Sequence, residues 1–137
     1  MELTPSQIRY LLAVYALHKD GAVRSADIAQ TLNVTRPSVH RMALQLSDMG
    51  LLVKEKYSSV GFTDTGRIIA EQYHCCFCCI CTLLSQNLSL PHAPAEAGAL
   101  AVLSSLSITK LRSVYNQTAA QLPSYGYHNK TCPLSAL

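Results

Sequence analysis

Five of the chain's six cysteines fall within seven positions, from Cys75 to Cys81, and His74 directly precedes them. Thiolates and imidazoles are ligands that soft ions such as zinc and copper(I) select. If this stretch is helical, side chains three or four positions apart lie close enough to bind one ion together. The candidate metal ligands are therefore His74, Cys75, Cys78, Cys79 and Cys81. The candidate cofactor is a soft transition metal ion.

Two other interpretations of this cysteine cluster stay open. Thiols without a metal behave as small apolar residues, so the cluster could simply pack at a dimer interface. Redox sensing would instead need an ionised thiolate, and the only nearby cation is His74 when it is protonated. A tetrahedral metal site would need further ligands, which Cys132, His92, His128 or a partner chain would have to supply.

A second group of residues has the chemistry of DNA recognition. Arg36 and Arg41 can each bind guanine through two hydrogen bonds, and nearby hydroxyls can reach bases or phosphates. Lys54, Lys56 and Tyr57 are suited to backbone phosphates, which position a protein without reading the sequence. The predicted DNA-binding residues are Ser25, Thr35, Arg36, Pro37, Ser38, His40, Arg41, Lys54, Lys56 and Tyr57.

Three short helices would position this second group. The first is predicted to begin with Thr4 as its cap, and the second to cover 26–32 with Ser25 as its cap. The third begins after Thr35 and is closed by Gly50. Its apolar residues recur at helical spacing on one face, which leaves the polar group on the opposite face.

The segments that follow complete a recognisable order. Two β-prone runs, 51–56 and 60–63, predict a two-stranded hairpin with its turn between them. Helix, helix, turn, helix and hairpin form a winged helix-turn-helix, whose third helix enters the major groove of DNA. A long helix over about 64–86 then carries the cysteine cluster, and two more helices are predicted over 95–104 and 109–122.

The predicted fold class is mainly α, a winged helix-turn-helix followed by a helical dimerisation module. The DNA-binding domain is expected at 1–73 and the dimerisation module at 74–137, with the long helix shared by both. The segment 87–94 contains two prolines and is the best candidate for a boundary. The later apolar helices exceed what a small winged unit can cover, which predicts a homodimer.

Composition limits the possible classes of protein. Hydrophobic residues make up 49% and charged residues 14%, which fits a packed core and excludes a disordered chain. A net charge of +3 permits DNA binding but argues against an unspecific polyanion binder. The longest apolar run, 75–84, is about half the ~20 residues that a membrane helix needs, and 1–10 has no targeting signal. We expect a cytoplasmic protein without a membrane, and clustered cysteines suit a reducing compartment.

No enzymatic site stands out in the sequence. The chain has eight acidic residues and shows no paired carboxylates, no Ser-His-Asp order and no phosphate-binding glycine loop. We therefore expect no catalytic residue and no small-molecule substrate. The main interpretation is a transcriptional regulator that binds double-stranded DNA. The alternative is a winged-helix module that binds protein and has no affinity for DNA.

The predicted winged unit resembles the DNA-binding half of the iron- and manganese-dependent repressors, the DtxR/MntR-type family. This resemblance implies homodimers on palindromic operators, dimerised through helices after the winged unit. The short length is similar to family members that lack a third, SH3-like domain. Over about Thr4 to Tyr73, the matching pieces are Val23-Arg24-Ser25 with Asp27-Ile28-Ala29, Pro37-Ser38-Val39, Gly50-Leu51-Leu52, Glu55-Lys56-Tyr57, and Thr63 with Gly66.

The resemblance also implies metal ligands that this sequence does not have. Arg9 and Leu12 match the family's acidic ligands in the first helix, and Phe77 matches its histidine in the long helix. Cys81 stands where some members have a carboxylate, and the family's Glu-His pair falls on the apolar residues 101–102. Apolar side chains and arginine cannot coordinate a hard divalent ion. We therefore expect no manganese or iron(II) switch, and an effector that is altered or lost.

Overall fold

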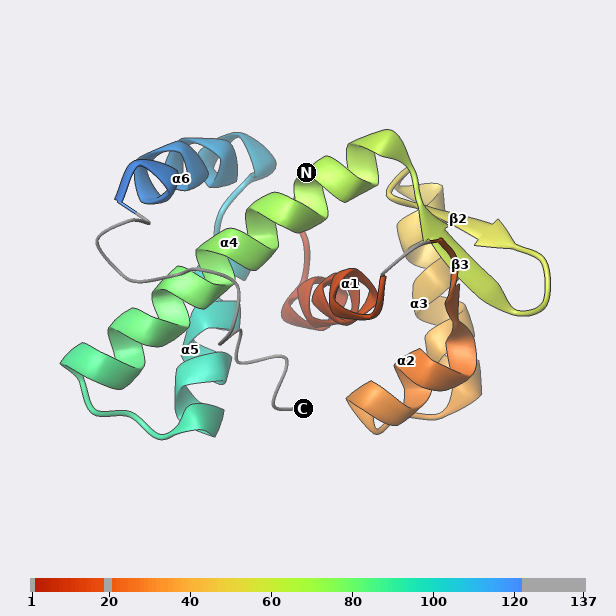
Figure 1. Cartoon of the computed structure of the whole chain (residues 1–137), viewed down its shortest axis with the longest axis horizontal. Coiled ribbons are helices and arrows are strands. Elements are labelled where there is room, and N and C mark those ends of the chain that lie inside the picture. The colour runs from red at the N-terminus through yellow and green to blue at the C-terminus, as the bar shows by residue number, and fades with distance from the viewer. Residues whose placement is uncertain (1, 19–20, 122–137) are drawn as a thin grey trace. The chain divides into compact units, whose positions relative to one another are not determined.

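The structure is a computed structural model that describes residues 2–18 and 21–121, with side chains as far as residue 117 (Figure 1). The predicted fold class is confirmed: helices dominate, and a small antiparallel sheet lies within the first half of the chain. The elements in chain order are α1 (Pro5–Leu17), β1 (Val23–Arg24), α2 (Ser25–Leu32), α3 (Arg36–Asp48), β2 (Leu52–Glu55), β3 (Ser59–Phe62), α4 (Asp64–Asn87), α5 (His92–Ser104) and α6 (Ile108–Gln121).

The chain divides into two compact units. One unit is Arg9–Glu71, which we call the winged unit. The other consists of the described residues of Met1–Ile8 and Gln72–Leu137, and we call it the helical unit. Both divisions fall inside helices, since α1 and α4 each run without interruption from one unit into the other.

The sheet of the winged unit has three strands in the order β1-β3-β2, all antiparallel. The predicted two-stranded hairpin was therefore incomplete. Strand β1 was missed because it has two residues, too few to show an alternating pattern. Its pairing of Val23 with Val60 ties the segment before α2 to the hairpin. The hairpin turn includes Tyr57 and Ser58, whose positive φ angles of 62° and 54° reverse the chain.

Three threonines cap helices, and the sequence predicts all three of these helix starts. Thr4 Oγ1 accepts a hydrogen bond from Gln7 N at 3.2 Å, while Gln7 Oε1 accepts one from Thr4 N at 3.0 Å. This reciprocal capping box fixes the start of α1. Thr35 Oγ1 accepts from Ser38 N at 3.3 Å at the start of α3. Thr63 Oγ1 accepts from Gly66 N at 2.9 Å at the start of α4.

Ser25, in contrast, is not a helix cap, and that prediction was wrong. The cap position of α2 is Arg24, which makes no side-chain capping bond. Ser25 is instead the first residue of the helix, and its N–H donates to Ser58 O at 2.9 Å. The hairpin therefore satisfies an N–H that a side chain would otherwise cap. The other end matches the prediction, since Asn33 terminates α2 in the left-handed conformation.

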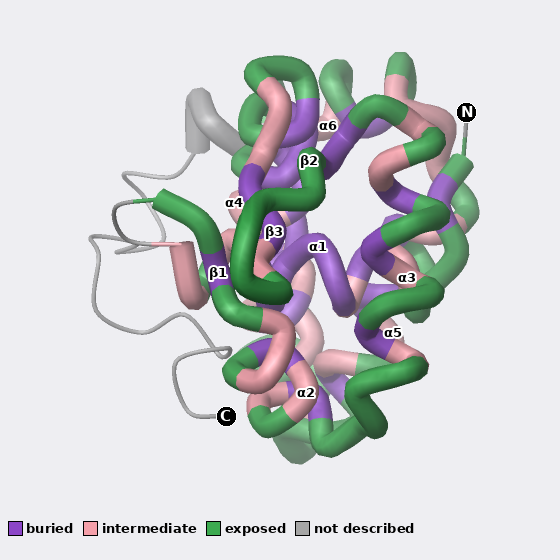
Figure 2. The backbone as a smooth tube through the Cα atoms, turned by 90° about the vertical axis from the view of Figure 1, so that its right-hand side faces the viewer, coloured by how far each residue is buried: buried purple, intermediate pink, exposed green. Residues whose placement is uncertain are grey.

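The core of the winged unit is built from one face of each helix and the inner face of the sheet. Ile28, Val39 and Leu46 are buried, as the apolar spacing predicts. Tyr10 in α1 is also buried, and its hydroxyl donates to Val39 O at 3.4 Å. Burial raises the pKa of Tyr10 to about 12. Figure 2 shows α1 as a nearly continuous buried stretch.

The helical unit differs from the prediction at one helix start. Helix α5 begins at His92, three residues before the predicted 95. The segment between α4 and α5 is therefore shorter than the predicted 87–94. Pro91 occupies the cap position and Pro94 lies in the first turn, where a missing N–H costs no hydrogen bond. Helix α6 agrees with the prediction except that Leu122 lies outside the described residues.

Helix α4 carries the core of the helical unit. Tyr73 and Phe77 are fully buried, and Leu103 and Leu111 from the later helices are buried too. By length and mean hydropathy, 1.4 over its most apolar window, α4 could also cross a membrane. Half of that window is buried inside the protein, as is common for the central helix of a soluble domain.

Candidate nucleic-acid interface

The first turn of α3 is held in shape by its own side chains. Thr35 Oγ1 lies 2.9 Å from Ser38 Oγ, in addition to capping the helix. Arg41 Nη2 donates to Ser38 Oγ at 3.5 Å. The hydroxyls of Thr35 and Ser38 therefore form hydrogen bonds within the turn, and the Ser38 hydroxyl orients Arg41. Arg36, Pro37 and Arg41 are exposed.

A groove of about 770 Å³ gathers much of the predicted DNA-binding group. It lies within the winged unit, where the start of α3, the start of α2 and the β2–β3 hairpin face one another. Four predicted residues, Thr35, Ser38, Arg41 and Lys56, are not among its lining. The predicted residues that line it are Ser25, Arg36, Pro37, His40, Lys54 and Tyr57.

One contact joins the third helix to the hairpin across this groove. His40 Nε2 lies 3.4 Å from Lys54 Nζ. Because an ammonium only donates, the imidazole nitrogen is the acceptor in this contact. The sequence had presented His40 as a solitary surface histidine. The structure gives it a partner on β2, so it positions a candidate phosphate-binding lysine.

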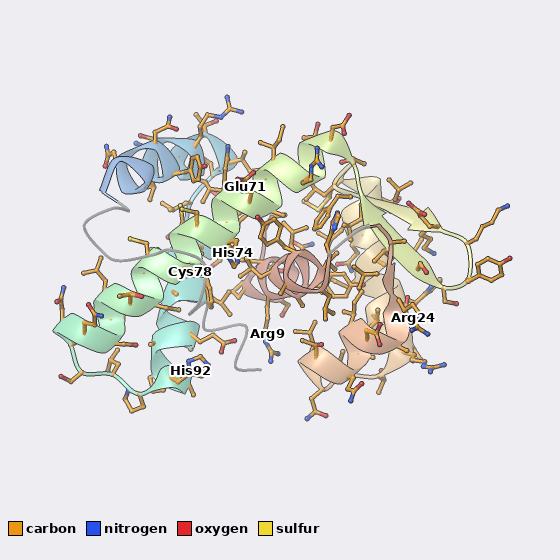
Figure 3. The ribbon with its side chains drawn as sticks, viewed as in Figure 1. Arg9, Arg24, Glu71, His74, Cys78 and His92 are labelled. Carbon is orange, nitrogen blue, oxygen red and sulfur yellow. The ribbon has the colours of Figure 1, made fainter. Side chains whose placement is uncertain are left out.

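Two charged residues of the groove were missed in the sequence. Arg24 lines it from β1 (Figure 3) and forms an exposed ion pair with Asp27 at 3.8 Å. Glu55 also lines it from β2, so the groove contains a carboxylate as well as the cationic residues Arg24, Arg36 and Lys54. The three-stranded sheet brings Arg24 to the groove, and no local sequence pattern predicts that pairing. Glu55 could have been found by asking which residues neighbour Lys54 and Lys56.

Tyr57 stands at the tip of the hairpin and is 93% exposed. Its φ of 62° lies in the left-handed region, which a bulky residue rarely adopts. An exposed aromatic ring in a strained turn is a feature that stability alone does not explain. It therefore belongs with the candidate contacts, as a side chain displayed toward a partner.

The candidate metal ligands in α4 are mostly inside the protein. Cys78, Cys79 and Cys81 are buried, and Cys75 and His74 are half-buried. Burial raises the pKa of Cys79, which opposes formation of a thiolate. The thiols pack in the core of the chain itself, which supports the packing interpretation without requiring a dimer interface.

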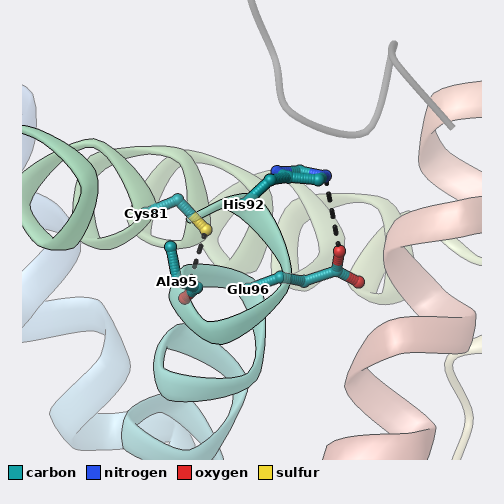
Figure 4. A network of polar contacts seen from close by, with 4 residues as sticks. All are labelled: Cys81, His92, Ala95 and Glu96. Atoms are coloured by element: carbon teal, nitrogen blue, oxygen red, sulfur yellow. Dashed lines mark hydrogen bonds and ion pairs between the residues drawn. The ribbon is translucent and has the colours of Figure 1, made fainter. Parts of the chain in front are cut away.

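The cluster does not assemble a metal site of three or more ligands within the described residues. No group of three or more His, Cys, Asp or Glu residues is arranged to hold an ion in that part of the chain. Cys81 Sγ lies 3.8 Å from Ala95 O, and His92 pairs with Glu96 at 3.7 Å instead of facing the cluster (Figure 4). Two further candidates, Cys132 and His128, lie outside the described residues.

The residues also do not fit a hard divalent ion. Helix α1 contains no Asp or Glu, so it offers no carboxylate at any position. Leu12 and Phe77 are buried apolar side chains. From residue 72 to the end of the sequence the only carboxylate side chain is Glu96. Manganese and iron(II) prefer oxygen and imidazole ligands, and the described residues do not provide a set of them.

The fold and the groove define the class of the winged unit, a winged helix-turn-helix. Residues 2–60 match the family model described as iron dependent repressor, N-terminal DNA binding domain. The chain is also 37% identical over 70 residues to the HTH-type transcriptional regulator MntR of Geobacillus kaustophilus. Residues 2–60 therefore resemble the N-terminal DNA binding domain of the iron dependent repressors, and the resemblance seen in the sequence is confirmed.

Solved structures show the same fold at lower identity. The manganese regulator SloR is 23% identical, with a TM-score of 0.62 over 83% of this chain and 55% of that chain. A hypothetical protein from Sulfolobus solfataricus is 22% identical, with a TM-score of 0.60 over 96% of this chain and 99% of that one. The match to MntR covers 50% of this chain and 50% of that regulator.

Proposed function

We propose that this protein is a cytoplasmic, non-enzymatic transcriptional regulator that reads double-stranded DNA with its winged unit. The observation that carries the proposal is the groove of the winged unit. Six of the ten DNA-binding residues chosen from the sequence line it, and they come from three separate elements. If these six residues lay on solvent-facing surfaces only by chance, they would be spread over the surface of the unit instead of lining one groove.

In this proposal the first turn of α3 enters the major groove. Arg36 and Arg41 read base edges, and guanine is the base whose acceptors an arginine fork matches. Lys54, Lys56 and Tyr57 on the hairpin contact phosphates and fix the register. The His40–Lys54 contact of 3.4 Å holds the lysine beside the helix, so both kinds of contact are made at once.

We further propose that the protein acts as a homodimer on a palindromic operator. The dimerisation module would be 74–137, and the DNA-binding domain 1–73. Exposed apolar side chains of the helical unit, Leu83, Leu88 and Val102, are surfaces that a second copy would cover. Two winged units would then bind half-sites about one helical turn apart, or a multiple of it. A monomer in sedimentation at micromolar concentration would contradict the dimer.

The proposed effector is not manganese or iron(II). The absence of carboxylates from α1 and the single carboxylate after residue 71 support this. A ligand shifts a conformational equilibrium only through different affinities for the two states. Without a ligand set for a hard ion, that difference cannot arise.

The test is a mobility shift with the full chain and random-sequence duplex DNA at low salt, followed by selection of the bound sequences. Phosphate contacts alone should give detectable binding that weakens steeply as salt rises. Selection should then yield an inverted repeat. Absence of any shift at low salt would reject DNA binding and favour the alternative, a winged-helix module that binds protein.

A further inference from the structure

One contact in α4 has no part in the proposed DNA interface. His74 Nε2 lies 3.8 Å from Cys78 Sγ, one helical turn further along (Figure 3). The histidine is half-buried and the cysteine is buried, 5% exposed. An imidazole nitrogen and a sulfur are thus held close together at the edge of the core.

The donor set excludes most biological ions. Hard cations need several oxygen ligands, and although Glu71 precedes His74 by three positions, the described residues hold no group of three or more His, Cys, Asp or Glu that could bind such an ion. Structural zinc takes four ligands, and the described residues hold no group of three suitable side chains. With hard cations and four-coordinate zinc excluded for the described residues, the remaining class is a soft ion with two ligands.

We propose that His74 and Cys78 form a two-coordinate site for a soft monovalent ion, copper(I) being the biological example. Thiolate and imidazole ligands both suit copper, and thiolate selects its reduced form. Metal bonds to these donors are on the order of 2 Å each, so a linear sulfur–metal–nitrogen unit spans about 4 Å. The 3.8 Å separation needs to open only slightly to accept the ion.

The binding step needs no oxidant or reductant. The Cys78 S–H bond breaks, its proton passes to solvent, and a sulfur–copper bond forms with copper remaining in the +1 state. His74 contributes the lone pair of Nε2 and keeps its proton on Nδ1, and its neutral ring is the form that binds metals. Binding releases the Cys78 proton, so copper competes with protons for the sulfur.

Neighbouring thiols are less suited to the same ion. The Cys81 thiol donates toward Ala95 O at 3.8 Å, which directs it to α5. Cys79 is buried, with a pKa raised by burial, and its helical position differs from that of Cys78 by about 100°. Cys79 is therefore a matched control: it has the same residue type, burial and helix, but no histidine partner in the pair.

The experiment is an anaerobic titration of the full-length chain with copper(I), in competition with bicinchoninate. We expect one ion to bind with the highest affinity. Cys78→Ser and His74→Gln should each weaken that binding at least tenfold, and Cys79→Ser should leave it unchanged. X-ray absorption at the copper edge should show one sulfur and one nitrogen. Cys132 is present in every protein compared, so any ion it binds is common to all.

Three results would overturn the proposal. One is wild-type affinity in both Cys78→Ser and His74→Gln, and another is equal loss in Cys79→Ser. The third is a copper centre with three sulfur neighbours. If Cys78→Ser does not fold, as judged by circular dichroism, His74→Gln decides alone, because it leaves the buried thiols intact. The readout is metal binding, so the result is independent of whether the protein binds DNA.

Discussion

The two units of this protein differ in the chemistry they offer to a ligand. Fourteen Lys, Arg, Asp and Glu residues lie within 9–71, against four within 72–137. The winged unit displays its charges around a groove, whereas the helical unit encloses thiols and apolar side chains. The first composition suits a polyanion, and the second suits packing and soft ions.

The two units also differ in how they relate to known regulators. The family model matches residues 2–60 and stops before the cysteine cluster. The helical unit shares its fold with solved structures, but among its described residues no group of three or more His, Cys, Asp or Glu is arranged to hold an ion. A fold can therefore be kept while the signal that controls it changes.

The largest expected effect concerns a glycine in each unit. A Cβ on Gly66 in α4 would overlap the backbone carbonyl of Leu51, which cannot move without disrupting the sheet. We expect Gly66→Ala to lower the free energy of unfolding by about 3 kcal/mol or more. A Cβ on Gly98 in α5 would meet only the end of the Leu84 side chain, at 3.0 Å.

Gly98→Ala is therefore the matched control. It should change stability by no more than about 1 kcal/mol, because alanine favours the helix while Leu84 adjusts its rotamer. Urea unfolding followed by circular dichroism measures both variants. Equal stability of the two would mean that the close approach of α4 to Leu51 is not real.

The next effect separates base contacts from phosphate contacts within the winged unit. Arg36→Ala and Arg41→Ala should each cost about 1–3 kcal/mol of operator binding and relax sequence selectivity. Lys56→Ala should weaken all sequences alike and reduce the salt dependence by about one phosphate. Arg112→Ala, an exposed arginine of α6, should change nothing. Fluorescence anisotropy with selected and scrambled duplexes measures these effects, and unchanged selectivity in both arginine variants would refute the docking.

Two caps, one in each unit, give a smaller effect. Thr35→Ala removes the acceptor for Ser38 N and Thr4→Ala removes the acceptor for Gln7 N. Each should lower the free energy of unfolding by about 1 kcal/mol. Only Thr35→Ala should also weaken DNA binding, since only that cap shapes the recognition turn. If Thr4→Ala also lost DNA affinity at a temperature at which it is folded, the claim that only the Thr35 cap affects DNA binding would be wrong.

The smallest effect is a gain. Glu55→Gln removes the one carboxylate that lines the groove, so DNA affinity should rise roughly two- to five-fold at low salt, for every sequence. Asp48→Asn, at the end of α3 and outside the groove lining, is the control and should have less effect. A fall in affinity for Glu55→Gln would indicate that the carboxylate contacts a base, as glutamate can with cytosine.

Local chemistry explains which features the sequence could predict. Thr35, Thr63 and Gly50 act through neighbours three or four residues away, so their roles are visible in the sequence. Strand β1 and the His40–Lys54 contact depend on segments fourteen or more residues apart, and no local pattern encodes them. Ser25 failed as a cap for the same reason, because its N–H found the distant Ser58.

We propose that the winged unit reads DNA without a hard divalent metal, whether manganese or iron(II). The most direct measurement is affinity of the full chain for its selected duplex, with manganese titrated in and with a chelator added. We predict the same dissociation constant, within twofold, under both conditions. A tenfold or greater tightening by manganese would contradict the claim and show that the chain assembles a hard-metal site.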